Sequence, residues 1–547
     1  MKVIGLSILF CFLMLMSSQA QTPKSSSLQT FMGDRFGMFI HWGPVSLRGT
    51  EIGWSRGKEV PQEEYDSLYK EFDPVLFNAD AWVKAAKDAG MKYLTITARH
   101  HDGFCLWPTK YTDYNIANTP YKKDILAALS TACKKQNIKF CIYYSVLDWH
   151  HPDYPMHGPD SQTPDPKADM NKYIVFMKQQ LKELITQYDP YMLWFDGQWE
   201  SPWTDAMGKE IYAYVKALKP SVITNNRLGK AFAAMDNKEI NAADMIGDYD
   251  TPERVVGRLN MQMPWESCFT ICQQWSWKPN DKLVPLKKCL SIISQTAGSN
   301  GNLLLNVGPM PDGRIEARQV KRLKELGDWL KVNGTAIYNT AGGPYLPTEN
   351  YVTTRSGNNI YVHVLNTDTA LLTLPALPGV VIKNAHTISG EPVVINTKDD
   401  HINIALPASM RGATQYIIVL ELNKDALSIP VVMRKTKTII RKYTDQTTID
   451  ASKLTKESFS ATIMYLKEAQ LMDKIMLTDA VIAKEIGLAD EVYTAYMQDD
   501  EKVPNDIFDT LRQHYGSYLK GRCYQIKAMF THPDPFAAGE IDEEAQM

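Results

Sequence analysis

Between residue 36 and about residue 310, short apolar runs alternate with segments whose apolar residues recur at three- and four-residue steps. Near-continuous apolar runs are typical of strands that are buried on both faces of a parallel sheet. The three- and four-residue recurrence predicts helices between several of these strands, at 78–90, 124–136, 169–188 and 286–298. The predicted strands are FGMFIHWG (36–43), MKYLTITARHHDGF (91–104), KFCIYYSVLDW (139–149), YMLWFDGQW (191–199), SVITNNR (221–227), ADMIGDYD (243–250), WESCFTI (265–271) and NLLLNVGP (302–309).

This alternation of eight strands with helical crossovers predicts an α/β fold, a (β/α)8-type barrel that occupies residues 28–334. The later strands lie close together, so some crossover helices there are expected to be short or missing. A doubly wound open sheet is the alternative. It is weakened because no G-x-G-x-x-G sequence follows the first predicted strand. A predicted helix at 316–334 closes the barrel segment.

The pattern changes twice after residue 334. Residues 335–425 contain short β segments separated by turns, which predicts a small antiparallel β-sandwich. Residues 430–547 are amphipathic with helical spacing, which predicts a helical extension of unknown role. The sequence leaves the oligomeric state open, with a homo-oligomer as one alternative.

The first 20 residues have the layout of a secretory signal peptide: Lys2, an apolar run over 3–16, and small residues ending at Ala20. We therefore expect an exported protein, periplasmic or extracellular. No later segment has 18 uninterrupted apolar residues, so no membrane span is expected. Seven cysteines follow the signal peptide, an odd number that leaves at least one thiol free. Cys268 and Cys272 are interpreted as packed thiols because no second pair with zinc-like spacing stands nearby.

Charge and aromatic content limit the classes of partner that the protein is expected to bind. The formal net charge of −3 gives no basic field that would attract nucleic acid or an anionic membrane. The chain has 12 Trp and 27 Tyr, which suits either ordinary packing or a site that stacks on sugar rings.

The carboxyl ends of the strands form the site in barrels of this kind. Polar residues stand at seven of the eight predicted strand ends, and together they predict one functional site. They are His41 with Trp42; His100, His101 and Asp102; Tyr144 and Asp148; Asp196; Asn225, Asn226 and Arg227; Asp248, Asp250 and Glu253; and Glu266.

Metal-dependent hydrolysis is one chemistry that these residue types could support, because His and Asp side chains bind zinc. The sequence has no HExxH spacing, and the first predicted strand ends in His41-Trp42-Gly43 without an H-x-H pair. Arg227 would also repel a dication. A G-x-S-x-G nucleophile motif is absent. We therefore expect no metal and no cofactor.

Glycoside hydrolysis is the other chemistry, since it needs two carboxyl groups: one protonates the leaving oxygen and the other attacks or activates water. Asp196 ends the aromatic run YMLWFD, between Trp194 and Trp199. A carboxylate there can be aimed rigidly at a sugar, and Arg227 would keep it ionised.

Several segments together resemble the exported α-L-fucosidases of glycoside hydrolase family 29. They are FGMFIHWG, TARHHDGFCLWPTKYTDYN, YYSVLDWHHPDY, LWFDGQW, TNNR, the WESCFTI and WSW pair, and SNGNLLLNVGPMPDGRI, and the resemblance covers residues 28–423. It implies that Asp196 is the nucleophile of a retaining mechanism. It also implies sugar-binding roles for His41, His100, His101, Tyr144 and Arg227, with Trp42, Trp194 and Trp277 as aromatic walls.

The acid/base residue has two candidates, Glu253 in YDTPERVV and Glu266 in PWESC. The resemblance favours Glu253 and leaves Glu266 as a supporting or hydroxyl-binding residue. The implied activity is exo-acting hydrolysis of terminal α-L-fucose from fucosylated glycans by double displacement. The alternative is a catalytically weak or inactive carbohydrate-binding relative. Whether α1-2, α1-3, α1-4 or α1-6 linkages are cleaved is left open.

Overall fold

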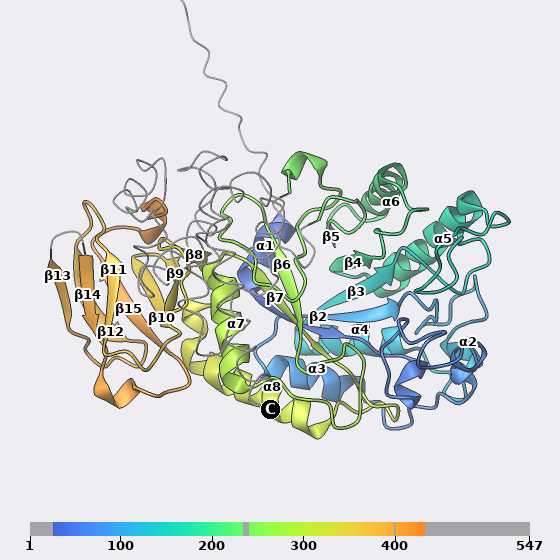
Figure 1. The fold of residues 1–547 in the computed structure, drawn as a ribbon, viewed down its shortest axis with the longest axis horizontal. Helices are drawn as coiled ribbons and strands as arrows, with labels where there is room; N and C mark the ends of the chain where they lie inside the picture. Colours follow the sequence, from blue (N-terminus) through green and yellow to red (C-terminus); the bar gives the residue numbers. More distant parts are fainter. Residues whose placement is uncertain (1–25, 233–239, 399–400, 433–547) are drawn as a thin grey trace, which may run out of the picture.

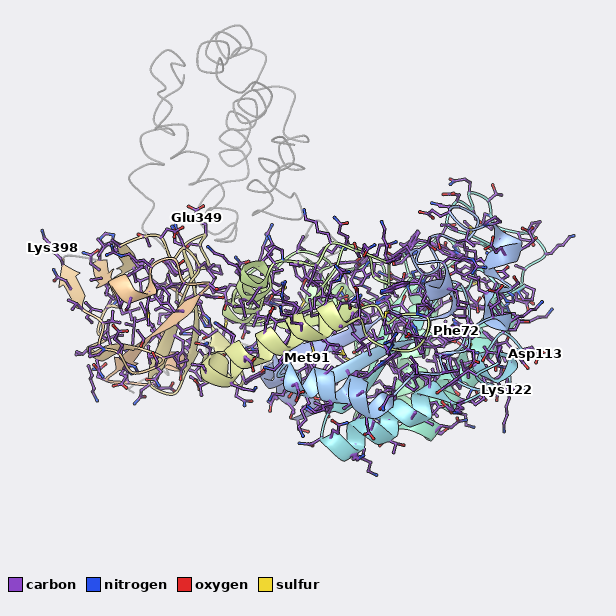
Figure 2. All side chains as sticks on the ribbon, turned by 90° about the horizontal axis from the view of Figure 1, so that it is seen from below. Phe72, Met91, Asp113, Lys122, Glu349 and Lys398 are labelled. Atoms are coloured by element: carbon purple, nitrogen blue, oxygen red, sulfur yellow. The ribbon has the colours of Figure 1, made fainter. Side chains whose placement is uncertain are left out.

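The computed structural model describes residues 26–232, 240–398 and 401–432 (Figure 1). The predicted signal peptide and nearly all of the predicted helical extension lie outside the described residues. Figure 1 shows the antiparallel strands at one end of the molecule and the parallel sheet toward the other. Figure 2, viewed from below, likewise places Glu349 and Lys398 at one end and Phe72, Asp113 and Lys122 toward the other.

Seven parallel strands form the curled sheet, which confirms the predicted barrel-like α/β class. Their order across the sheet is β5 (Ile223–Thr224), β4 (Met192–Asp196), β3 (Lys139–Ser145), β2 (Tyr93–Arg99), β1 (Phe36–Ile40), β7 (Asn302–Val307) and β6 (Glu266–Thr270). All described strand pairs in this sheet are parallel, so all seven carboxyl ends lie at the same edge.

The predicted strand at 243–250 is wrong as a regular strand, although the chain does pass between β5 and β6 there. Residues 246–250 make only single bridges, to residues 225 and 227 on one side and 265 on the other. The Asp248 carboxylate occupies part of the ladder, because the Thr224 N–H donates to Asp248 Oδ2 at 2.8 Å. Gly247 has φ 155°, and a Cβ there would lie 2.2 Å from the Asn225 carbonyl oxygen. The Asp248 side chain and the close approach of Gly247 to Asn225 therefore take the place of a continuous backbone ladder between this segment and β5.

Helices cover the outside of the parallel sheet, and four of them begin with a side-chain cap. Asn78, Asp124, Asp169 and Thr204 each accept a hydrogen bond from a first-turn N–H with their side chain. The helices are α3 (Ala79–Asp88), α4 (Ile125–Gln136), α5 (Met170–Tyr188), α6 (Asp205–Leu218), α7 (Leu286–Gly298) and α8 (Ala317–Asn333). Their apolar faces and the outward side chains of the strands form the largest core. Shorter helices are α1 (Ser26–Asp34), α2 (Gln62–Tyr65), η1 (Pro44–Leu47), η2 (Leu68–Lys70), η3 (Ile116–Asn118), η4 (Ala242–Asp244) and η5 (Gly334–Ala336).

Inward side chains of the strands form a second core inside the barrel, which includes Phe39, Tyr143 and Trp194. Helix α1 contributes Phe31, whose ring centroid lies 5.5 Å from that of Tyr93 and 4.8 Å from that of Tyr249. Tyr93 begins β2, so α1 packs at the amino ends of the strands. The carboxyl ends of the strands lie at the opposite end of the barrel from α1.

Two antiparallel sheets follow the barrel segment and share one apolar core. The first has the order β12 (Ile382–Thr387), β15 (Tyr416–Leu422), β10 (Asn359–Val364), β9 (Tyr351–Ser356) and β8 (Ala341–Gly342). The second has the order β11 (Leu371–Pro375), β14 (His401–Ala405) and β13 (Ile395–Lys398), and η6 (Ala408–Met410) and η7 (Ala426–Ser428) complete the elements. Ser294 of α7 contacts His363 Nδ1 at 3.1 Å and accepts a hydrogen bond from Gln415 at 2.7 Å, which joins the first sheet to the barrel.

None of the helices among the described residues has both the length and the apolar character that a membrane crossing requires.

Candidate active site

Asp196 is the last residue of β4, and its carboxylate is paired on both oxygens. Oδ1 accepts a hydrogen bond from Nη1 of Arg227 at 2.8 Å, and Oδ2 accepts one from the hydroxyl of Tyr143 at 3.0 Å. The residue is only 8% exposed. A charge at the end of a buried aromatic run is tolerated here because a cation and a neutral donor both bind it.

Arg227 follows β5 and connects two carboxylates. Its Nη2 donates to Glu253 Oε2 at 3.0 Å, and its Nε donates to the Thr251 hydroxyl at 3.0 Å. The guanidinium also lies over the Trp194 ring, 4.7 Å from the centroid. Burial lowers the pKa of Arg227, but the charges of Asp196 and Glu253 outweigh this effect, and the pKa lies above its ordinary value.

Glu253 lies beside the edge strand β6, where its backbone bridges to Cys268. Its side chain is 24% exposed, whereas the side chain of its partner Arg227 is 2% exposed. The next residue, Arg254, has φ 56° and donates its N–H to the Cys268 carbonyl at 2.9 Å. Glu253 is therefore held in place by its backbone but keeps an accessible carboxylate.

Glu266, the second acid/base candidate, is enclosed deeper in the barrel and is 1% exposed. Its oxygens accept hydrogen bonds from the Tyr93 hydroxyl, from Trp194 Nε1 at 3.1 Å and from the Tyr249 hydroxyl at 3.4 Å. Burial raises the pKa of Glu266 to about 7 despite these donors. The structure thus places Glu266 beneath Trp194, as a support for the ring that carries Arg227.

Three histidines from β1 and the end of β2 lie beside Asp196. His41 contacts Asn306 and His101 contacts Ser145 through their Nδ1 atoms, at 2.7 and 2.8 Å. His100 stacks on Tyr143, with ring centroids 5.3 Å apart and an interplanar angle of 8°.

These histidines are neutral. Burial lowers the pKa of His41 and of His101 to about 3, and it lowers the pKa of His100 well below the ordinary value. Nε2 of His101 lies 3.7 Å from Asp196 Oδ2, so this contact is not an ion pair.

Tyr144 is not in the group around Asp196, which corrects its predicted sugar-binding role. Its hydroxyl donates to Gln180 of α5 at 2.9 Å, and the Arg99 guanidinium lies over its ring at 4.2 Å. Successive strand residues point to opposite faces, so Tyr143 points inward and Tyr144 points toward the helices. Tyr143 is one of the residues that the sequence did not single out.

Trp42 is likewise not a wall of the site. It is buried against Phe72 and Trp82, with ring centroids at 5.1 and 5.0 Å, and its indole N–H donates to the Met310 carbonyl at 3.1 Å. The same alternation explains this, because its neighbour His41 takes the inward position.

Trp194 lies in the core inside the barrel, and the roles of Trp194 and Trp277 as aromatic walls stay predictions. Trp277 is half-buried, and its indole N–H is enclosed without a partner among the described residues. Trp275 is the residue that packs on His41, with ring centroids 4.8 Å apart.

Two partly exposed tryptophans complete the rim. Trp54 and Trp199 are 37% and 39% exposed, and their rings stack at 6.2 Å with an interplanar angle of 17°. Both lie near His101, with ring centroids at 5.7 and 5.3 Å. Trp54 was missed because its loop, GTEIGWSRG, follows no predicted strand directly; its aromatic side chain among polar residues was the available signal.

The remaining strand-end residues hold the backbone of the site. The Asn225 side chain accepts a hydrogen bond from the Phe195 N–H and donates one to the Phe195 carbonyl oxygen, both at 2.8 Å. The other supporting pairs are Asn226 with Asp250, Asp248 with Lys216, Asp102 with Tyr65, and Asp148 with Arg99. Within the described ranges, no three His, Cys, Asp or Glu side chains are grouped as a metal ion would need.

Comparison with known proteins gives consistent matches. A family model described as Alpha-L-fucosidase matches residues 15–335. The tissue alpha-L-fucosidase of Bos taurus is 32% identical over 331 residues, which cover 56% of this chain and 67% of that protein. The alpha-L-fucosidase of Branchiostoma floridae is 30% identical over 332 residues, which cover 56% of this chain and 71% of that protein.

Solved structures match over a longer part of the chain. Alpha-L-fucosidase isoenzyme 1 from Paenibacillus thiaminolyticus has a TM-score of 0.66 and 32% identity, and the match covers 73% of this chain and 99% of that one. A GH29 alpha-L-fucosidase from Bacteroides thetaiotaomicron, solved as a trapped covalent intermediate with 2-fluoro-fucosyl fluoride, has a TM-score of 0.66 and 29% identity. That match covers 72% and 96% of the two chains.

Proposed function

The chain belongs to the alpha-L-fucosidase family, glycoside hydrolase family 29, and we propose that Asp196 and Glu253 are its catalytic pair. The enzyme is a retaining, exo-acting α-L-fucosidase that releases terminal α-L-fucose from fucosylated glycans. The observation that carries the assignment is that Arg227 binds both carboxylates, each through a different nitrogen.

The first step of the mechanism is attack of Asp196 on the anomeric carbon. The bond from this carbon to the leaving oxygen breaks, and Glu253 gives its proton to that oxygen. Arg227 and Tyr143 hold Asp196 in the position for attack. Glu253 is the more exposed partner of Arg227, so we propose that it leaves the guanidinium and turns to the leaving oxygen when the substrate binds.

The second step hydrolyses the fucosyl-enzyme ester. Glu253, now a carboxylate, takes a proton from water while the water oxygen attacks the anomeric carbon and Asp196 leaves. Two inversions leave the product in the α configuration. The sequence of steps needs no cofactor.

The fucose ring is proposed to bind among the three histidines and Arg227, with Trp275 against its apolar surface, while the buried Trp194 supports Arg227 from below. Trp54 and Trp199 at the rim would contact the rest of the glycan. The exposure of these two rings supports this placement. An inactive carbohydrate-binding relative finds no support here, since Asp196, Glu253 and Arg227 are all present and connected.

We also propose that residues 1–20 are removed on export, to the periplasm or the cell exterior, and that residues 28–334 and 335–425 are the catalytic barrel and β-sandwich domains. Sequencing the amino terminus of the exported protein tests the first point. A mature chain that starts at Gln21 is the expected result, and a chain that retains Met1 would contradict it.

The test of function is release of 4-nitrophenol from 4-nitrophenyl α-L-fucoside by wild type and by Asp196→Ala. Wild-type turnover with a loss of several orders of magnitude in the variant is expected. Asp328→Ala on the outer face of α8 is the matched control and should retain activity. Equal activity of Asp196→Ala would remove Asp196 as nucleophile, and an inert wild type on aryl and oligosaccharide fucosides would favour the binding relative.

A further inference from the structure

His41 is held in one tautomer by Asn306. The amide Nδ2 of Asn306 donates to the Trp275 carbonyl at 2.6 Å, which fixes the opposite atom, Oδ1, toward His41. This oxygen can only accept, so His41 Nδ1, at 2.7 Å, must carry the proton. A neutral imidazole has one N–H, so His41 Nε2 is left with a lone pair.

His101 is held in the same tautomer by a different residue type. The Ser145 hydroxyl donates its proton to the Leu147 carbonyl at 2.7 Å, because a carbonyl oxygen can only accept. The serine oxygen is then an acceptor toward His101 Nδ1, at 2.8 Å. His101 Nε2 therefore also has a lone pair, and it lies on the side of Asp196.

The Nε2 atoms of these two rings are not enclosed by the surrounding residues. Neither His41 Nε2 nor His101 Nε2 is among the enclosed, unpartnered atoms of the described residues, whereas His100 Nδ1 is both enclosed and unpartnered. The Tyr143 hydroxyl proton is already directed to Asp196. The group of side chains around Asp196 therefore contains two fixed acceptors.

We infer that Asn306 and Ser145 are positioning residues that turn His41 and His101 into obligate hydrogen-bond acceptors, so that the ligand must donate two hydroxyl protons to this side of the site. The inference deepens the proposed function, on which the identity of the ligand as α-L-fucose rests. It predicts a selectivity rule: a sugar whose hydroxyl is replaced by fluorine keeps its size and acceptor character but loses the required proton.

Protonation of either ring would remove its acceptor, and the surroundings prevent it. Burial is the main cause for both rings. For His101 the neighbouring charges of Arg227 and Arg99 add to it, and for His41 the charge of Arg254 does so. The rings thus remain neutral acceptors through the neutral pH range.

The deciding measurement is the tautomeric state of both rings in the full chain labelled with 15N-histidine, read from long-range 1H–15N correlation spectra. His41→Gln and His101→Gln assign the signals. Protonated Nδ1 and unprotonated Nε2 are expected for both residues. A proton on Nε2 of either ring would overturn the inference for that ring. This readout requires no turnover.

Variants of the positioning residues link the tautomers to ligand selectivity. Ser145→Ala and Asn306→Leu should lose the single Nδ1–H signal of His101 and of His41 respectively, while Ser145→Thr, which keeps a hydroxyl, should retain it. Binding of L-fucose is then compared with its 2-, 3- and 4-deoxyfluoro analogues by calorimetry. Wild type should bind two of these analogues about tenfold more weakly, and each penalty should shrink in the matching variant. A wild type that binds all three analogues as tightly as fucose would overturn the inference.

An unchanged penalty in both variants would overturn the claim that Asn306 and Ser145 act through the histidines. Failure of the proposed function would give a different result. The wild-type protein would show the inferred tautomers but would neither bind fucose nor cleave fucosides, which would refute the function and leave the assignment of the two rings standing.

Discussion

Asp196 and Glu253 accept hydrogen bonds from two nitrogen atoms of one guanidinium, Nη1 and Nη2 of Arg227. The planar guanidinium therefore sets the relative position of the proposed nucleophile and acid/base. It is itself held over the Trp194 ring, which in turn donates to Glu266. The relative position of the two carboxylates thus depends on the buried contacts of Arg227 with Trp194 and of Trp194 with Glu266.

Replacing this guanidinium by an ammonium should separate geometry from charge. Arg227→Lys keeps one positive charge but cannot reach both carboxylates with a planar fork. We expect kcat/KM for 4-nitrophenyl α-L-fucoside to fall by about 10²–10³-fold. The exposed Arg318→Lys is the matched control. Activity of Arg227→Lys within a few fold of wild type would mean that charge alone is sufficient.

The two acid/base candidates should differ in their response to the leaving group. Glu253→Ala removes the proposed proton donor, so a loss of about 10²–10⁴-fold is expected for phenyl α-L-fucoside. The loss should be much smaller for the 2,4-dinitrophenyl substrate, whose leaving oxygen needs no proton. Glu266→Gln should affect both substrates equally. The reverse pattern would make Glu266 the acid.

Tyr143 and Tyr144 form an internal matched pair. Tyr143→Phe removes the hydrogen bond to Asp196 Oδ2, and we expect kcat/KM to fall by about tenfold or more. Tyr144→Phe removes only the hydrogen bond to Gln180, so activity should persist while the free energy of unfolding drops by about 1 kcal/mol. Steady-state kinetics and urea unfolding of both variants measure this. Equal kinetic losses would contradict the assignment of faces.

Glu266 should make the stability of the protein depend on pH. Its pKa is raised from 4.5 to about 7 in the folded chain, so the folded state binds the proton more tightly than the unfolded state does. The stabilisation is complete below pH 4.5 and is lost as pH rises through about 7. Relative to Glu266→Gln, wild type should lose up to about 1.4 kcal/mol of unfolding free energy per pH unit in this window. Parallel pH profiles in urea unfolding would contradict this.

The sequence could predict the strands and their polar ends because continuous apolar runs and helical spacing are local signals. It could place Asp196, Arg227 and Glu253 near one another because parallel strands share one edge. It could not decide which of two adjacent residues points inward. Tyr143 and Tyr144 are equally aromatic, and only the register of β3 against β4, Tyr143 with Trp194 and Ser145 with Asp196, separates them.

Loop residues were less accessible for another reason. Trp54 and Trp275 reach the site through segments whose paths depend on distant contacts. One such contact is the Glu51 carboxylate, which accepts hydrogen bonds from the backbone N–H groups of Trp275 and Ser276. The sixth predicted strand failed because a side chain, Asp248, takes part of the ladder. Neither effect has a periodic signature in the sequence.

The passage of residues 246–250 between β5 and β6 gives the barrel wall an uneven density of backbone hydrogen bonds. Five of the seven strands are joined to two neighbours by regular ladders, whereas here single bridges connect the chain on each side. Asp196 ends a strand with a regular ladder to β3, and Glu253 follows directly after the segment that has single bridges. A small widening of the barrel at this segment would move Glu253 relative to Asp196 at the cost of a few hydrogen bonds. Such a movement would let the proposed acid/base shift between donating to an aglycone and activating water while the proposed nucleophile keeps its place.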